Sequence, residues 1–512
     1  MINILNKSKG KSLFLSLGFL MLLAACKKDP VVVKPDPIPP GTTGTRTELT
    51  KDSIFLYAKE TYFWNDVLPT PAVFSARNFA DFQKELDAIT AYKIVNGKKI
   101  DKYSFLDDGS LASELGGQAG DYGFSARFNN GNLNDLRIKF VNGGSPAASS
   151  NVKRGQQIIN INGRTDLNGS NDATLSFLND AIFGNKASIA MSLKNLDGSI
   201  INVTVTRGSY SLNPILFKKV YTVGLKKVGY LVFNSFTTNA TDSLVKTFAR
   251  FSSEGISEVI VDLRYNGGGS VSTAVDLTNL IAPSSANGGV MFTTYWTKTM
   301  QDGNAKILAY KPALDEFGKL IPYTKGVNGK YLTFADYNYE PTEAAGNIDR
   351  FKKTGAANLT RAYFIVAGGT ASASELVINN LRPVMDVKLI GKKTYGKPVG
   401  FFAITIDKLD MYIPQFQTKN SLDYGDYFDG MLVDKDALDD MSKDFGDPTE
   451  TSLANALSYS ATGAFLSTQP NNRISSVGSV SQYEVDRVNA QLSSHEFKGM
   501  VLNRTKLKFK KQ

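Results

Sequence analysis

The stretch GGTASASELVINNLRPVMDVKLIGKKTYGK, residues 368–397, decides the fold of the region around it. A short apolar run at residues 361–367 precedes it, and this predicts a buried strand that enters a tight turn at the two glycines. A helix should follow and end before Pro383, because three apolar residues recur at helical spacing: Leu376, Val377 and Leu381. Residues 387–390 predict a second buried strand.

Ser372 falls at the N-terminus of the predicted helix. Unpaired backbone N–H groups and the positive end of the helix dipole meet there, so the position favours a nucleophile whose reaction develops negative charge. A structural interpretation competes with this one, because Ser372 and Glu375 match a helix capping box. The local pattern alone favours the cap.

The protein contains one histidine, His495, in a polar C-terminal region. A Ser-His-Asp triad would have to take its base from there, whereas a Ser-Lys pair needs no histidine. Lys397 lies in a glycine-bounded loop after the second predicted strand and is the candidate base. The apolar residues around it and the nearby helix N-terminus would both lower its pKa.

The runs TASASE at residues 370–375 and KTYGK at residues 393–397 resemble the C-terminal processing (tail-specific) serine peptidases. The resemblance implies that Ser372 is the nucleophile and Lys397 the general base. Members of that family commonly carry a glutamine four residues after the lysine, where this chain has Phe401. Three alternatives follow: a polar group such as Gln415 or Gln417 orients the lysine, the dyad works without an orienting side chain, or the enzyme is weakened.

A second motif, DLRYNGGGS at residues 262–270, places three glycines at the end of a predicted strand. It lacks the Gly-Lys-Ser/Thr ending of a phosphate-binding loop, so a nucleotide site is disfavoured. The run is similar to the DLR-x-N-x-GG motif of the same family. That similarity implies an oxyanion hole made by the N–H of Gly268, or of its neighbour Gly269, together with the N–H of Ala373.

Length and composition are those of a soluble globular protein with several domains: 512 residues, 42% hydrophobic and 21% charged. The net charge is +10, and it falls to +7 when the three lysines before Cys26 are left out. Because the excess is modest and widely spread, no nucleic-acid partner is expected. The motifs call for no cofactor and no metal, and an acidic segment at residues 434–447 lacks the glycine of a calcium loop, so we expect it to be a solvated surface.

The N-terminus predicts export and anchoring. Residues 1–25 have a basic start and a short apolar core, and LAAC at residues 23–26 resembles a bacterial lipobox. Cys26 is the only cysteine, so it cannot form an internal disulfide, and lipidation is its most economical role; a plain signal peptide is the alternative. Residues 26–46 would then be a flexible tether. We expect a lipid-anchored protein in the cell envelope of a Gram-negative-type bacterium, on the periplasmic or outer-membrane face.

Periodicity divides the remainder of the chain. Residues 47–117 predict a small helical domain, and residues 118–208 predict strands interrupted by one helix. The run around residues 144–169 is similar to the PDZ domains of this peptidase family. The similarity implies a binder of peptide C-termini whose carboxylate cradle contains Tyr122, Gly123 and Phe124, with the peptide added to the strand edge that follows; a β-domain that binds nothing is the alternative.

Residues 209–465 predict the α/β catalytic domain, and residues 466–512 predict a polar, poorly ordered tail. Residues 283–359 show no clear periodicity and form either a lid or a surface decoration. The expected fold is therefore a multidomain α+β chain. The resemblance implies that its peptidase core is of the ClpP/crotonase-like type.

The most probable function from sequence is a membrane-anchored Ser-Lys endopeptidase acting on polypeptides with accessible C-termini. Two other classes remain open. Ser-x-x-Lys acyl-transferase matches occur at Ser150 to Lys153 and at Ser243 to Lys246, and short matches of this kind arise by chance. A binding protein that keeps a peptidase fold without its activity is the stronger rival. The substrate, the membrane face and the oligomeric state are not determined by sequence.

Overall fold

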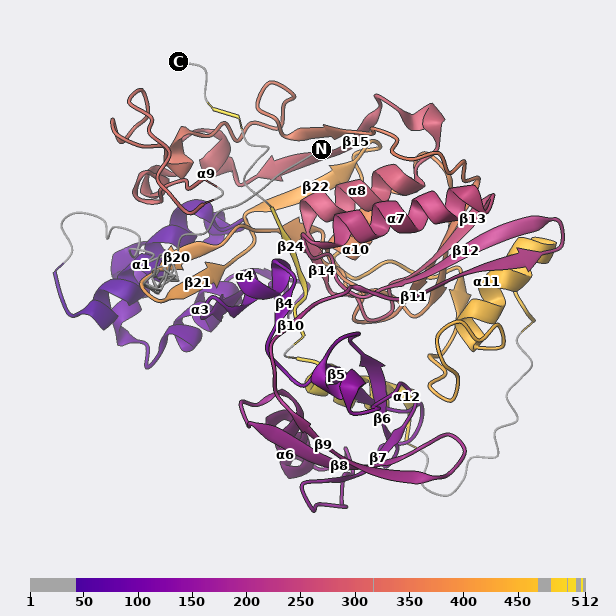
Figure 1. The fold of residues 1–512 in the computed structure, drawn as a ribbon. Coiled ribbons are helices and arrows are strands. Elements are labelled where there is room, and N and C mark those ends of the chain that lie inside the picture. The colour runs from indigo at the N-terminus through magenta and orange to yellow at the C-terminus, as the bar shows by residue number, and fades with distance from the viewer. Residues whose placement is uncertain (1–42, 316, 468–479, 495, 503–507, 510–512) are drawn as a thin grey trace, which may run out of the picture.

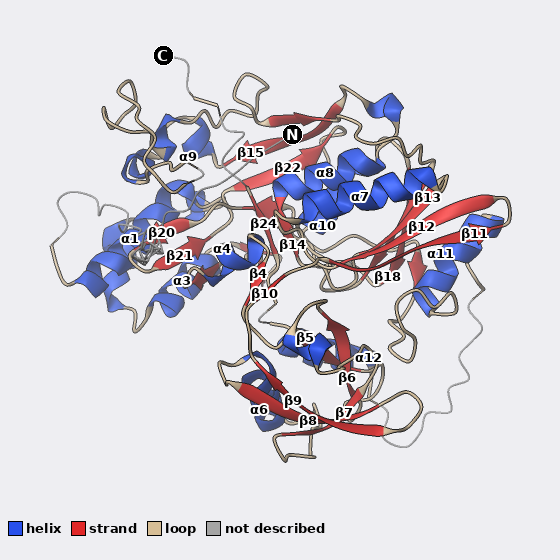
Figure 2. Cartoon of the chain, viewed as in Figure 1, coloured by secondary structure: helices blue, strands red, loops and turns tan. Residues whose placement is uncertain are grey.

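The computed structural model describes residues 43–315, 317–467, 480–494, 496–502 and 508–509. The predicted signal peptide, Cys26 and His495 lie outside the described residues, as does most of the predicted tether. The described chain is a mixed α/β structure with helices at its N-terminal end and several separate sheets (Figures 1 and 2).

A six-stranded sheet forms the centre of the largest part. Its strand order is β11-β12-β13-β17-β18-β23; β11 is antiparallel to β12, and the strands from β12 to β23 are parallel. The bounds are β11 Ile215–Val223, β12 Lys226–Phe233, β13 Glu258–Asp262, β17 Arg361–Val366, β18 Asp386–Gly391 and β23 Lys435–Asp436. All five residues of β13 are buried, as expected of a parallel strand covered on both faces.

Helices cover both faces of this sheet (Figure 1). One face packs against α7 (Ala240–Ser253), α8 (Val271–Ile281) and α10 (Ala373–Leu381), and the other packs against α11 (Thr451–Thr462). Alternate residues of β17 divide between the two cores: Phe364 belongs to the first, and Tyr363 and Ile365 belong to the second. The strand, helix and strand predicted around residues 361–391 are confirmed, and α10 ends before Pro383.

A smaller lobe has a sheet and a core of its own. We call it the small lobe and define it by the five-stranded sheet β5-β6-β7-β8-β9 and helix α6. Its elements are β5 Phe124–Phe128, β6 Leu136–Val141, α5 Pro146–Ser149, β7 Gln157–Ile161, α6 Asp172–Phe183, β8 Ser188–Lys194 and β9 Ile200–Thr206. The predicted run of strands and the predicted helix, α6, are confirmed, and the structure adds the single turn α5. Figure 2 shows strands dominating this lobe.

The N-terminal region, predicted to be helical, contains the helices α1 (Arg46–Thr61) and α3 (Phe82–Ala91), with the single turn α2 (Pro71–Phe74) between them. Their buried residues belong to the same core as α7, α8 and α10. This region is therefore packed onto the part of the chain built around the six-stranded sheet, which is the predicted catalytic part. Short elements then lead to the small lobe: β1 Ile94–Val95, β2 Lys98–Lys99, β3 Phe105–Asp107, α4 Ser110–Leu115, β4 Gln118–Ala119 and, after the lobe, β10 Tyr210–Ser211.

Residues 283–359 contain two strands that the sequence did not predict. β15 (Val290–Trp296) pairs with β16 (Ile348–Arg350) on one side and with β22 (Phe416–Asn420) on the other, and β22 pairs with β19 (Val399–Gly400). β15 does not show the alternation of apolar and polar residues that marks a half-buried strand, because Trp296 and its neighbours bury both of its faces. The remaining elements here are α9 Lys298–Gln301, β20 Ile404–Ile406 and β21 Leu409–Tyr412.

The expectation that everything after about residue 466 is poorly ordered is wrong for two segments. Helix α12 (Gln482–Leu492) buries Val485, Val488 and Leu492 in the core of the small lobe. Strand β24 (Gly499–Val501) pairs with β14 (Gly268–Ser270) in parallel. Both segments are short and sit among polar residues, so their apolar positions gain meaning only from distant partners.

Candidate active site

Ser372 lies at the turn between β17 and α10, at the N-cap of that helix. Its backbone has φ 60° and ψ −109°, a region that non-glycine residues rarely adopt and that costs about 1–3 kcal/mol. The residue is fully buried, and its Oγ has no hydrogen-bond partner among the described residues. A strained turn that presents an uncommitted hydroxyl at a helix N-terminus is the geometry of a nucleophile.

Glu375 connects the serine to the lysine loop. Its Oε2 accepts the backbone N–H of Ser372 and the backbone N–H of Lys397, each at 2.8 Å. Its Oε1 accepts the N–H of Gly396 at 2.8 Å and the hydroxyl of Thr394 at 2.5 Å. Burial raises the pKa of this carboxyl, and the four donors oppose that rise. The carboxylate predicted to cap the helix therefore also holds the lysine loop against it.

Lys397 is fully buried, and its Nζ donates to the backbone carbonyl of Lys498 at 2.8 Å. The same nitrogen lies 4.0 Å from the centroid of the Phe401 ring and 5.3 Å from that of Tyr103. Burial lowers the pKa of Lys397 well below its usual value, although the carboxylates of Asp101 and Glu375 pull the other way. The lowered pKa favours the neutral amine, which is the form that can act as a base.

The two glutamines named as alternatives to the missing family residue do not contact the lysine amine. Gln415 accepts the N–H of Phe402 at 2.7 Å, and Gln417 donates to the carbonyl of Gly425 at 2.9 Å. The main-chain carbonyl of Lys498 and the rings of Phe401 and Tyr103 surround the Lys397 amine instead.

The glycine loop at β14 lies directly beside the turn that carries Ser372. A Cβ placed on Gly268 would lie 3.1 Å from the nitrogen of Ala373, so the two predicted oxyanion donors border one space. The N–H of Gly268 already donates to Asn266 Oδ1 at 2.9 Å. Gly269, with φ 137°, is the next amide along this loop.

Asn266 braces that loop. Its Nδ2 donates to the backbone carbonyl of Phe233 at 2.9 Å. The backbone carbonyl of Asn266 accepts the N–H of Ala371 at 3.2 Å and the hydroxyl of Ser374 at 3.1 Å. The side chain belongs to the glycine motif recognised in the sequence, but its bracing role was not predicted. It holds the glycine loop and the serine turn in one unit.

The predicted carboxylate cradle lies at the start of β5. Tyr122 and Phe124 are buried, and the N–H of Gly123 donates to the Asp121 side chain at 2.7 Å. β5 is an edge strand of the small-lobe sheet, so one side of it has no partner strand in that sheet.

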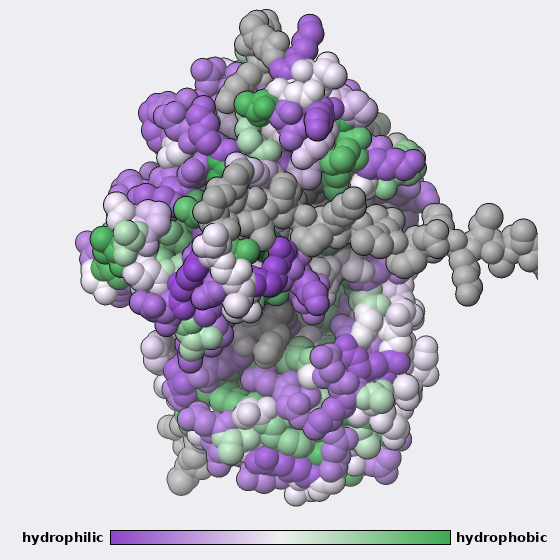
Figure 3. All heavy atoms as spheres, turned by 90° about the vertical axis from the view of Figure 1, so that its left-hand side faces the viewer, coloured by the Kyte–Doolittle hydropathy of each residue, from purple (hydrophilic) through white to green (hydrophobic). Residues whose placement is uncertain are grey.

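A cavity of about 1190 Å³ lies between the small lobe and the catalytic part. Its wall includes Lys139 of the small lobe, Gly368 before the Ser372 turn and Lys498, which directly precedes β24. Figure 3 shows a hollow on this side of the molecule, bordered by both hydrophilic and hydrophobic residues. Among the residues that line the cavity none comes from 283–359, so the described part of that insertion does not cover it.

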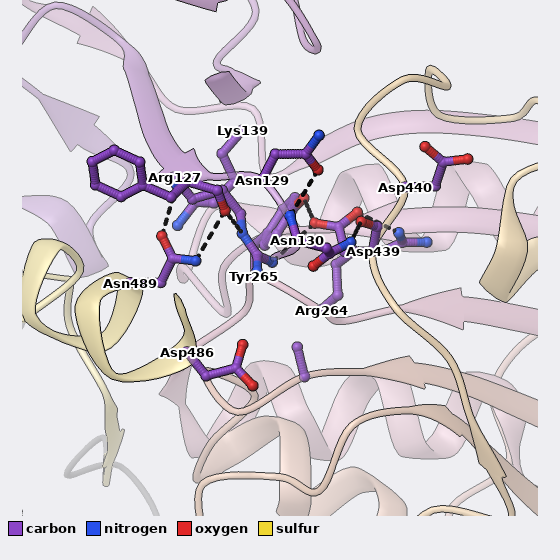
Figure 4. Close-up of polar contacts among 12 residues, drawn as sticks. Arg127, Asn129, Asn130, Lys139, Arg264, Tyr265, Asp439, Asp440, Asp486 and Asn489 are labelled. Carbon is purple, nitrogen blue, oxygen red and sulfur yellow. Dashed lines mark hydrogen bonds and ion pairs between the residues drawn. The ribbon is translucent and has the colours of Figure 1, made fainter. Parts of the chain in front are cut away.

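The acidic segment departs from the expected solvated surface at Asp439, whose side chain is only 7% exposed. Three guanidinium groups converge on its carboxylate: Arg127 at 3.1 Å, Arg154 at 2.7 Å and Arg264 at 2.9 Å. The Tyr265 hydroxyl donates to it as well, and Figure 4 shows this cluster, with Asp440 and Asp486 outside it. Burial acts to raise the pKa of Asp439, but the arginines outweigh it and hold the pKa below its usual range.

The described residues contain no group of three or more His, Cys, Asp or Glu side chains arranged to hold a metal ion. In the same part of the chain, no helix has both the length and the apolar character that a bilayer crossing requires. The acyl-transferase matches are poorly placed for catalysis, because Lys153 and Lys246 are exposed.

Part of the chain is similar to a known peptidase family. Residues 227–408 match the model of peptidase family S41. This part of the chain is therefore similar to the S41 peptidases. The match covers β12 through β20, and it includes Ser372, Lys397 and the glycine loop.

Individual relatives are distant. The chain is 24% identical over 255 residues to a carboxyl-terminal-processing protease of Picosynechococcus sp., covering 50% of this chain and 49% of that one. It is 21% identical over 336 residues to the chloroplastic C-terminal processing peptidase of Tetradesmus obliquus, covering 62% and 61%. The chain thus spans about half to three fifths of the length of these relatives.

Among solved structures, the fold resembles that of a structure described as an S41 protease from Bacteroides fragilis. The TM-score is 0.55 at 22% identity, and the match covers 83% of this chain and 98% of that one. This likeness extends the S41 fold beyond the region that the family model matches.

Proposed function

We propose that this chain is a serine endopeptidase that cleaves polypeptides with a Ser372–Lys397 dyad. The observation that carries the proposal is the Glu375 carboxylate, because one of its oxygens binds the backbone amides of both residues. The uncommitted hydroxyl of Ser372 and the lowered pKa of Lys397 support it. In this mechanism the neutral amine takes the proton from Ser372 as Oγ attacks the scissile carbonyl.

Backbone amides would stabilise the oxyanion. The N–H of Ala373 is one of the unpaired donors at the start of α10, and we place the second donor at Gly269, since the Gly268 N–H is occupied by Asn266. The proton on Lys397 then passes to the leaving amine, and water hydrolyses the acyl-enzyme.

The decisive experiment is digestion of casein, a substrate without a stable fold, followed by mass spectrometry of the released peptides. We expect Ser372→Ala to lower the rate by about 1,000-fold or more. Ser253→Ala is the matched control and should leave the rate unchanged, because that serine is exposed on α7. Equal peptide release by Ser372→Ala and wild type would make the chain a binding protein with a peptidase fold.

Recognition of C-terminal tails by the small lobe is the finer part of the proposal. The edge strand β5 and the loop containing Tyr122, Gly123 and Phe124 support it. The same assay with paired peptides that end in a free carboxylate or in an amide tests it. We expect slower cleavage of the amides, and equal rates would remove tail recognition while leaving the peptidase in place.

Anchoring through a lipid on Cys26 completes the proposal and would place the enzyme in the cell envelope. It rests on the sequence alone, together with residues 26–46 as a tether. We expect Cys26→Ser to move the protein from the membrane fraction to the soluble fraction. Retention of the variant in membranes after a high-salt wash would contradict a lipid anchor.

A further inference from the structure

The C-terminal strand β24 fills the groove beside the catalytic residues, and Figure 1 shows it next to β14. On one side Gly499 pairs with Gly268, and the Gly499 N–H donates to the Gly267 carbonyl at 3.0 Å. On the other side the Phe401 N–H donates to the Met500 carbonyl, and the Leu502 N–H donates to the Phe401 carbonyl, both at 3.0 Å. The segment is therefore held as an extended strand on both edges.

The carbonyls of this strand face the catalytic groups. The Lys498 carbonyl accepts the Lys397 amine at 2.8 Å. A Cβ on Gly268 would lie 2.3 Å from the Gly499 oxygen and 3.1 Å from the Ala373 nitrogen, so this carbonyl points into the space between the proposed oxyanion donors. In a parallel pair, a residue donates its N–H to one residue of the neighbouring strand and directs its C=O towards the residue two positions further along that strand. The Gly499 N–H bonds to Gly267, so the Gly499 carbonyl points towards Gly269. The Gly499 carbonyl thus lies where a scissile carbonyl would be bound.

The chain before β24 is seated on the small lobe. α12 packs against β5 and α6, and its Asn489 bonds to both backbone groups of Phe128, accepting the N–H at 2.7 Å and donating to the carbonyl at 3.0 Å. Phe128 ends the edge strand to which a bound peptide would add. Further along, Glu496 pairs with Lys139 and accepts the hydroxyl of Ser125 at 2.7 Å.

We call α12 together with residues 496–502 the C-terminal segment. It occupies the edge of the small lobe and the groove beside Ser372 and Lys397 at once. These are the two places that the proposed function assigns to a polypeptide substrate. We propose that the chain's own C-terminal segment is a substrate of Ser372, cleaved between Gly499 and Met500. This inference rests on the proposed peptidase function.

The reaction would follow the ordinary course of acyl transfer. Ser372 Oγ attacks the Gly499 carbonyl carbon while its proton passes to the neutral Lys397 amine, and the Gly499–Met500 bond breaks as that proton moves to the Met500 nitrogen. A water molecule then hydrolyses the ester, leaving a carboxylate on Gly499 and restoring the hydroxyl of Ser372. The balance is one peptide bond and one water consumed for two chain ends formed.

The groove also indicates a side-chain preference at the cleaved bond. A Cβ on Gly499 would lie 2.1 Å from the Phe497 ring and 2.9 Å from the Phe401 ring. Glycine is therefore the residue that fits before the bond, while the following Met500 is fully buried and fills an apolar site.

The test is C-terminal peptide mapping of the purified full-length chain by mass spectrometry, over a time course. We expect wild type to gain a chain end at Gly499 and to release residues 500–512, while Ser372→Ala keeps its original C-terminus. Lys508→Ala, an exposed position within the released part, is the matched control and should be cleaved as wild type is. Gly499→Val should slow the release at least about tenfold, since its side chain collides with the two rings.

Each other outcome decides against the inference. A wild-type chain that keeps its tail but digests casein would disprove self-cleavage and leave the proposed function standing. A chain that does neither would refute both. Loss of the tail at equal rates in wild type and Ser372→Ala, or serine-dependent cleavage at another bond, would also overturn the assignment of Gly499–Met500 to Ser372.

Discussion

The Lys397 amine can accept a proton only when it is neutral, so its surroundings decide whether the dyad works. A free lysine has a pKa near 10.4 and is almost entirely charged at neutral pH. Burial lowers the pKa of Lys397 strongly, and the positive charge of Lys498 adds to this, while Asp101 and Glu375 limit the effect. A neutral amine keeps N–H groups, so it can donate to the Lys498 carbonyl and still offer its lone pair.

Lys397→Arg should be nearly as damaging as Lys397→Ala, because a guanidinium stays charged and cannot act as a base. We expect kcat/KM for a peptide substrate to fall by about 100- to 10,000-fold in both variants. In wild type, kcat/KM should rise with pH through the lowered pKa of Lys397 and level off well below pH 10. The measurement is a pH profile of peptide cleavage.

Lys246→Arg, at an exposed position on α7, controls for the substitution itself and should change nothing. His495→Ala should also retain activity if no histidine takes part. A Lys397→Arg enzyme with most of its activity, beside an inactive His495→Ala enzyme, would replace the Ser-Lys mechanism by one that uses histidine.

At the scale of elements, Glu375 ties the start of α10 to the loop that follows β18. Four donors from two segments converge on its two oxygens. A glutamine has nearly the same shape, but its amide nitrogen would face two of those donors and could accept from neither. The two loops would then lose part of the connection that aligns the serine with the lysine.

Glu375→Gln should therefore reduce kcat about 10- to 100-fold, the scale of losing hydrogen bonds to a charged group. We expect KM to change little, because the carboxylate does not line the cavity. Steady-state kinetics measure both quantities, and Glu340→Gln, at an exposed position, is the control. A variant with raised KM and unchanged kcat would show that Glu375 shapes substrate binding instead.

Across the whole molecule, Asp439 joins the small lobe to the catalytic part. Arg127 and Arg154 come from the small lobe, whereas Arg264 follows β13 and precedes the glycine loop. Arg264 also pairs with Asp262 and Glu450, so the cluster reaches the N-terminus of α11. One buried carboxylate thus offsets positive charges contributed by both parts.

Asp439→Asn should destabilise the protein by about 3–5 kcal/mol, because it leaves buried guanidinium groups without their shared partner. Urea unfolding would measure the loss, with Asp486→Asn, at an exposed position, as the control. The lowered pKa of Asp439 means that its contribution is present at neutral pH and is lost as the pH falls below about 4 towards the folded-state pKa. Equal stability of Asp439→Asn and wild type at pH 7 would show that the cluster contributes no net stability.

Local patterns were sufficient for much of the catalytic fold. The apolar run before Gly368 and the three apolar residues after Ser372 predicted β17 and α10, because a strand and a helix differ in period within a few residues. Ser372, Lys397 and the glycine loop were chosen from motifs, and the structure brings all three around one carboxylate and one asparagine. Where a partner was distant in the chain, the same patterns were not sufficient. β15 was missed because its pairing partners lie 55 or more residues away at β16 and β22.

The sequence by itself determined the strand, helix and loop that carry Ser372 and Lys397, since those depend on neighbours a few positions apart. Only the tertiary structure decided what surrounds them. The sequence predicts a solvated Asp439, because its charged neighbours in sequence are mainly acidic. In the structure its partners are arginines from other segments. The sequence predicts a polar tail after residue 466, since nothing close in sequence pairs with it. The burial of Met500 and the pairing of Gly499 depend on β14 and Phe401, which the fold brings together from distant parts of the chain. Long-range burial and charge pairing reverse the local preference of a segment, and no short window of sequence contains them.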